Sequence, residues 1–188
     1  MQITLMRHGK PRLPKTGWIT PRGMKQWIEN YDDSDIETDS IPSECYIAAA
    51  SAKLIATSTL KRAALSAQAL GHEVLISDSV FCEAELPHSF WPAPCLSPQA
   101  WAVFFRLLWF CGYSRGAASQ KMTRMRAKEA ARKLVLAAKE GPVLLVGHGL
   151  MNRYIGKELR AAGWTTASKH ENCYWGLGTY RAIPSSLL

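Results

Sequence analysis

The sequence predicts a three-layer α/β/α sandwich, in which a mainly parallel sheet carries helices on both faces. Apolar runs at residues 3–6, 54–57 and 143–146 are too short for helices and are typical of buried strands. Helical patterns follow the second and third runs, and this alternation favours parallel strands. A length of 188 residues with 47% hydrophobic residues suits one globular domain, 1–188, with a sizeable core.

The first strand ends in Arg7-His8-Gly9, followed by Lys10 and Pro11, which a strand interior would not keep. Open α/β sheets bind ligands at the carboxyl ends of their strands. An arginine there can bind phosphate, a histidine can act as a nucleophile or proton carrier, and a glycine allows close approach. Taken alone, the tripeptide is weak evidence.

Two further corners repeat this layout. After the strand at 54–58, residues 59–70 form a predicted helix that ends at Gly71, with Ser58 or Thr59 as N-cap. Arg62 falls in its first turn, where a cation opposes the helix dipole unless an anion binds there; the alternative is a solvated surface arginine. The strand at 143–146 is followed by Gly147-His148-Gly149 and a predicted helix over 150–162. A single such histidine would be an ordinary loop residue, but a pair at two strand ends indicates one shared crevice.

The chain resembles the histidine phosphatase superfamily, the phosphoglycerate-mutase-like proteins. The pieces that carry the resemblance keep the family's order: residues 5–9, a weaker match at 19–26, Ser58-x-Leu60-x-Arg62-Ala63-x-x-Ser66-Ala67, and residues 146–149. It implies that His8 attacks phosphorus and becomes a phosphohistidine. It also implies that Arg7, Arg62 and His148 surround the phosphoryl group, with His148 cationic and His8 neutral. Gly9 and Gly149 would border the substrate, and no metal or cofactor is expected.

The family also needs a carboxylic acid that protonates the leaving oxygen and later activates water. Residues 72–76 are predicted to form the preceding strand, and alignment of the segment after it makes Glu83 the acid. Glu85 is the alternative, because two residues apart on an extended segment point to opposite sides. At least one of the two is a surface glutamate. His88, in the following loop, is the next candidate, although a surface histidine is the simpler interpretation.

Departures from the family pattern favour a phosphomonoester hydrolase. Lys10-Pro11 stands where the mutases carry an acidic residue, and the chain is shorter than theirs. A phosphoryl-transferring mutase is one alternative. A non-catalytic protein that recognises phosphate is another, although retention of the nucleophile argues against it.

An insertion over the active site is expected at about 86–120. It begins as a proline-rich loop and continues as a helix from Pro98, with an apolar stripe expected to pack against the sheet. A second helix should run from Ser119 to about Lys139. Residues 173–180 are predicted to form a last strand, at an edge because of their glycines.

Composition limits the setting. Five widely spaced cysteines fit neither a disulfide framework nor a metal site, and no signal peptide is recognisable, so a cytoplasmic protein is expected. The net charge of +8 would attract anionic substrates, small or protein-borne phosphate esters. No nucleic-acid module and no span long enough for a membrane are found. The acidic run at 29–39 is interpreted as a solvated loop, and the oligomeric state stays open.

Overall fold

A computed structural model describes residues 1–168, 171 and 173–182. Its centre is a six-stranded sheet of order β3-β2-β4-β1-β6-β5. The parallel strands are β1 (Gln2–Arg7), β2 (Leu54–Thr57), β3 (Ile76–Ser77) and β4 (Val143–Gly147). Two antiparallel strands, β6 (Leu177–Ala182) and β5 (Trp164–Ser168), complete the sheet beside β1. The mainly parallel sheet is therefore confirmed.

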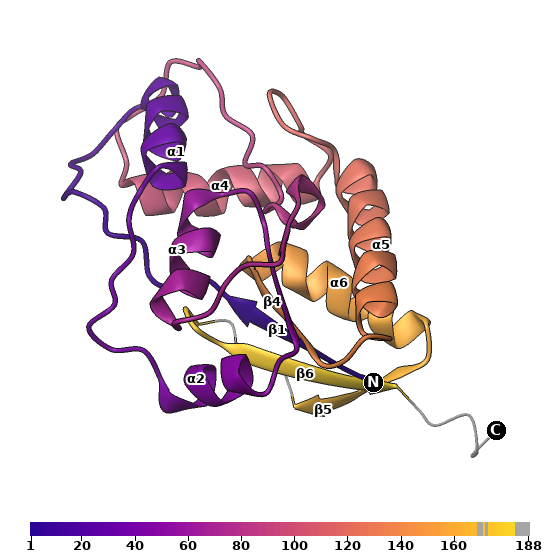
Figure 1. The fold of residues 1–188 in the computed structure, drawn as a ribbon. Coiled ribbons are helices and arrows are strands. Elements are labelled where there is room, and N and C mark those ends of the chain that lie inside the picture. Colours follow the sequence, from indigo (N-terminus) through magenta and orange to yellow (C-terminus); the bar gives the residue numbers. More distant parts are fainter. Residues whose placement is uncertain (169–170, 172, 183–188) are drawn as a thin grey trace.

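Helices cover both faces, as the sequence predicted (Figure 1). One face packs on α5 (Gln120–Ala137) and α6 (Gly149–Ala161), through Ile3 and Leu5 of β1. The other packs on α2 (Ser43–Ala50) and α3 (Lys61–Ala69), through Met6. This split follows the two-residue period of a strand, and it gives the three-layer sandwich.

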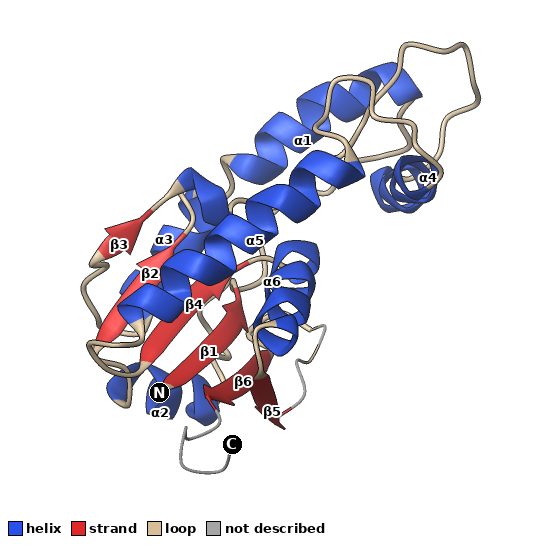
Figure 2. Ribbon diagram, turned by 90° about the vertical axis from the view of Figure 1, so that its right-hand side faces the viewer, coloured by secondary structure: helices blue, strands red, loops and turns tan. Residues whose placement is uncertain are grey.

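The carboxyl ends of β1, β2 and β4 point toward a group of helices and loops that lies beyond that edge of the sheet (Figure 2). It contains α1 (Met24–Asp32), preceded by the short helix η1 (Pro21–Gly23), and α4 (Pro98–Phe110). A second short helix, η2 (Ser79–Phe81), leads into the long loop before α4. We refer to α1, α4 and the loop at 82–97 as the cap.

The cap has a small core of its own, and here one prediction was wrong. Two buried residues of the α4 stripe, Trp101 and Phe105, pack with Met24 of α1 rather than against the sheet. Trp101 also donates a hydrogen bond from Nε1 to the carbonyl of Ile19, at 2.8 Å. Phe104 of the same stripe stays 41% exposed. An apolar stripe shows that a helix has a partner, but not which partner it has.

Two strand predictions also need correction. The strand expected at 72–76 is reduced to Ile76–Ser77. The last strand begins at Leu177 rather than 173 and lies inside the sheet, because β5 forms the edge beyond it. In β5 only Trp164 is buried and the four residues after it are exposed, so the sequence shows no alternating apolar pattern there.

The described helices include none that is both long enough and apolar enough to cross a membrane.

Candidate active site

His8 lies immediately after β1, buried to 2% exposure at the carboxyl edge of the sheet. Its Nδ1 is 2.7 Å from the carbonyl oxygen of Gly9, which can only accept a hydrogen bond. Its Nε2 is 3.2 Å from Nε of Arg62, which can only donate one. Together the two contacts assign the proton to Nδ1 and leave the lone pair on Nε2. The imidazole is thus held in the tautomer that a nucleophile attacking through Nε2 requires.

Burial keeps this imidazole neutral. Desolvation, followed by the charge of Arg62 and then that of Arg7, lowers the pKa of His8 from 6.5 to about 3. The hydrogen bond to Gly9 opposes this shift. A neutral His8, as the resemblance implied, agrees with this environment.

Gly9 brings the backbone close to its neighbours. Its N–H donates to Ser66 Oγ at 2.8 Å, which ties the end of β1 to α3. A Cβ at this position would lie 2.5 Å from the Trp175 ring, so a larger residue would force the ring or the backbone away. The glycine is therefore required for packing here.

Arg62 reaches the site from the first turn of α3, where the sequence placed it, and is itself only 2% exposed. Besides its contact with His8, its Nη1 lies 2.6 Å from Oδ1 of Asp32, and its guanidinium lies 4.8 Å from the ring centre of Tyr31. An anion thus does sit at this cation, as the unfavourable helix position suggested. It is a carboxylate of the protein, which a phosphate oxygen could replace.

His148 comes from the end of β4 and is the N-cap residue of α6. Its ring centre lies 5.0 Å from that of His8, and its Nε2 is 2.7 Å from Ser58 Oγ. The two strand ends therefore bring both histidines into one crevice. Gly149 begins α6 beside the Arg7 side chain, at ordinary contact distance.

The pKa shift of His148 runs in the direction opposite to the charge that the resemblance implied. Burial first, then Arg62 and His8, lower the pKa of His148 well below its usual 6.5. This shift disfavours the charged form of the imidazole, which is fully buried near two arginines. The sequence pattern could not show that burial.

The two candidate acids point in different directions. The Glu83 carboxylate accepts hydrogen bonds from the N–H groups of Leu150 and Met151, at 3.2 and 3.0 Å. These are the first turn of α6, directly after His148, so Glu83 lies at the same end of the sheet as the two histidines. Glu85 is exposed, and its Oε2 instead accepts from the N–H of Ala118, at 2.7 Å. His88, in the loop of the cap, packs its ring against Gly116 in the segment that follows α4.

Several residues of the site were missed from the sequence. Tyr174 covers Arg7, with 4.2 Å between the guanidinium carbon and the ring centre, and lies 5.7 Å from the His8 ring. Asp32 comes from the acidic run interpreted as a solvated loop; it pairs with Arg62 instead. The sequence carries no local signal for these pairs, since both arise from contacts between distant segments.

These side chains lie at a cavity of about 890 Å³ between the sheet edge and the cap. Its lining includes Arg7, Arg62, Glu83 and Tyr174, together with one face each of α1 and α4.

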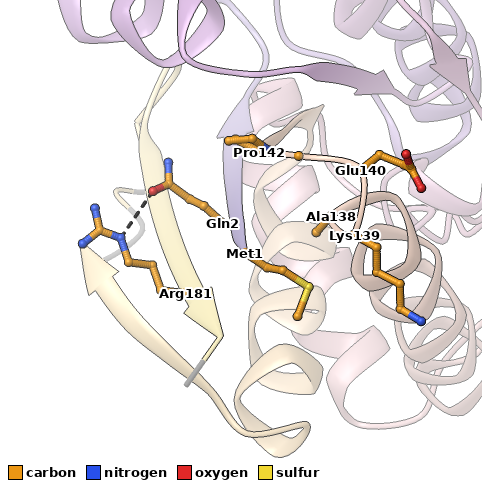
Figure 3. Close-up of a pocket in the computed structure, with 8 residues that line it drawn as sticks. Met1, Gln2, Ala138, Lys139, Glu140, Pro142 and Arg181 are labelled. Carbon is orange, nitrogen blue, oxygen red and sulfur yellow. Dashed lines mark hydrogen bonds between the residues drawn. The ribbon is translucent and has the colours of Figure 1, made fainter. Parts of the chain in front are cut away.

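A second hollow, of about 470 Å³, lies at the opposite ends of the strands, around Met1, Gln2 and Pro142 (Figure 3). Among its lining residues, Arg181 donates to Gln2 at 3.3 Å, and no histidine or cysteine is present. The cavity under the cap is lined by Arg7 and Arg62, and His8, which is not itself a lining residue, contacts Arg62. Among the described residues, no group of three or more His, Cys, Asp or Glu is placed to hold a metal ion.

Solved structures with the same fold identify its class. The chain superposes on the open reading frame Rv3214 product from Mycobacterium tuberculosis with a TM-score of 0.62 and 13% identity, covering 98% of this chain and 92% of that one. Mycobacterial glucosyl-3-phosphoglycerate phosphatase Rv2419c in complex with VO3 gives a TM-score of 0.55 and 21% identity, over 84% and 81% of the two chains. Bacillus stearothermophilus YhfR gives 0.55 and 18%, over 85% and 80%. No protein-family model and no curated protein sequence matches.

The chain therefore has the phosphoglycerate-mutase-like α/β fold, and the fold that the sequence motifs implied is confirmed.

Proposed function

We propose that this protein is a phosphomonoester hydrolase that works through a phosphohistidine on His8 and needs no metal ion. The observation that carries the proposal is the state of His8 itself. Its pKa is lowered to about 3, its proton is held on Nδ1 by Gly9, and its Nε2 is directed at Arg62. An imidazole held neutral, with its Nε2 lone pair accepting from Arg62, suits attack on a phosphate once the guanidinium turns to the phosphate oxygens.

In the first half-reaction, the Nε2 lone pair of His8 forms a bond to phosphorus while the bond to the ester oxygen breaks. Glu83, in its protonated form, gives its proton to the departing oxygen. Arg7 and Arg62 stabilise the charge on the equatorial oxygens, and Asp32 must first release the Nη1 of Arg62. His148, at 5.0 Å from the His8 ring, can donate a hydrogen bond to the same oxygens.

In the second half-reaction, Glu83 takes a proton from water, and the water oxygen attacks phosphorus. The N–P bond breaks, inorganic phosphate leaves, and His8 regains its lone pair on Nε2. Glu83 is protonated again, so all groups return to their starting state. The glutamate is anchored for this exchange by the backbone of α6, to which it is bonded at 3.0 Å.

The comparison structures support hydrolysis at the level of the fold, since one of them is a phosphatase bound to VO3. The direct test is phosphate release from nitrophenyl phosphate by the wild-type chain, the His8→Ala variant and His72→Ala as a matched control at an exposed histidine. We expect turnover by the wild type and the control, and at least a thousandfold loss in His8→Ala. Full activity of His8→Ala would contradict the proposal.

A further inference from the structure

Most of the surface that lines the cavity above the phosphate site is carbon, although charged side chains stand among the apolar ones. We propose that the substrate's alcohol is apolar, an alkyl or aryl alcohol rather than a sugar or another polyol. This inference rests on the proposed phosphatase function, because it assigns the part of the substrate that leaves.

One wall is aromatic and starts at the phosphate site. The centre of the Tyr31 ring lies 4.8 Å from the Arg62 guanidinium carbon. Trp27 lies one helical turn before Tyr31 on α1, and the centres of the two rings are 5.4 Å apart. Ile28, on the same helix, also lines the cavity. An alcohol esterified to a phosphate at Arg62 would therefore meet aromatic surface from its first carbon outward.

The other wall is the face of α4 that does not enter the core of the cap. Val103 and Leu107 line the cavity four residues apart, on one side of the helix. They are 62% and 59% exposed, whereas Phe105 between them is fully buried. Keeping two aliphatic side chains in water is unfavourable, and an apolar ligand between α1 and α4 would remove that cost.

The polar groups of this part of the cavity are already engaged. Arg106 donates to the carbonyls of Ala84 and Glu85, at 2.8 and 3.2 Å, and Arg126 donates to the carbonyl of Glu83 at 2.9 Å. The remaining polar groups of the described lining are few: Lys25 and Glu29 of α1, which pair with each other at 3.9 Å, the imidazole of His88, the amide of Gln99 and the hydroxyl of Ser79. A sugar would lose hydrogen bonds to water here and regain few, which disfavours it.

A chain-length series tests the proposal, because the leaving-group chemistry stays constant from ethyl through butyl to hexyl phosphate. A fully buried methylene group contributes about fourfold, and half burial about twofold. We expect kcat/KM to rise at least about tenfold from ethyl to hexyl phosphate, and glycerol phosphate to be a poorer substrate than butyl phosphate. The double variant Val103→Thr, Leu107→Gln should flatten the series. Leu136→Gln should not, since Leu136 is exposed on α5 and lies outside the cavity.

Binding separates this inference from the function on which it rests. Methylphosphonate and hexylphosphonate have no ester bond to hydrolyse, so their affinities report recognition alone. If the esters are hydrolysed but kcat/KM does not rise with chain length, or if the double variant leaves that rise unchanged, the inference is overturned and the proposed phosphatase function stands. If no ester releases phosphate, the phosphatase is wrong. In that case, tighter binding of hexylphosphonate would still support apolar recognition, and equal affinities would overturn it.

Discussion

Replacing His8 by glutamine should remove a large part of the protein's sensitivity to acid. The folded state holds His8 neutral, with its pKa lowered to about 3 mainly by burial, whereas the unfolded chain binds the proton near 6.5. For a depressed histidine pKa, the contribution to stability is fully present above 6.5 and is lost as the pH falls from 6.5 toward 3. At pH 5, binding of this proton stabilises the unfolded state relative to the folded state by about 2 kcal/mol. At pH 7.5 the same effect is close to zero.

The measurement is urea unfolding of the wild type and His8→Gln at pH 7.5 and at pH 5. The wild type should lose about 2 kcal/mol more free energy of unfolding than the variant between these two pH values. His148, whose pKa is also lowered, adds to the loss in both proteins, so the difference between them isolates His8. His72→Gln, at an exposed position, controls for replacement of a histidine elsewhere. Equal losses in the wild type and His8→Gln would refute the burial argument.

Three other predictions concern the chemistry and the cap. Chelation with EDTA should leave the hydrolysis rate unchanged, because arginine side chains supply the positive charge; loss of turnover that magnesium or zinc restores would show that a metal is needed. Glu83→Gln should slow hydrolysis of an alkyl phosphate far more than that of nitrophenyl phosphate, whose leaving group needs no proton, while Glu85→Gln should be nearly silent. The reverse pattern would assign the acid to Glu85. Phe105→Ala should cost about 3 to 5 kcal/mol in urea unfolding if the cap unfolds together with the sheet; a change below about 1 kcal/mol, with activity lost, would show that the cap melts separately.

The parts of this molecule that the sequence predicts well are those that depend on short-range patterns. The strands before Arg7 and His148 are mainly apolar runs, and the helix that carries Arg62 ends at Ala69, two residues before Gly71, whose φ of 76° suits glycine. Because parallel strands share one carboxyl edge, the meeting of the three motifs follows from local signals alone.

What the sequence could not predict depends on contacts between distant segments. Asp32 lies 30 residues from its partner Arg62, and nothing in an acidic run marks the one member that turns inward. The lowered pKa of His148 depends on its burial beside Arg62. The partner of the α4 stripe likewise becomes visible only when Met24 is seen to pack against Phe105.

The central claim is that His8 carries the phosphoryl group, and trapping that intermediate tests it most directly. The wild-type protein would be mixed with a phosphate ester labelled at phosphorus, denatured within the first turnovers with base, and digested for peptide mass spectrometry. The label should be found on His8, stable in base and lost in acid, and it should be absent from His8→Ala. A label on another residue, or rapid turnover with no protein-bound phosphate at any time, would contradict the account.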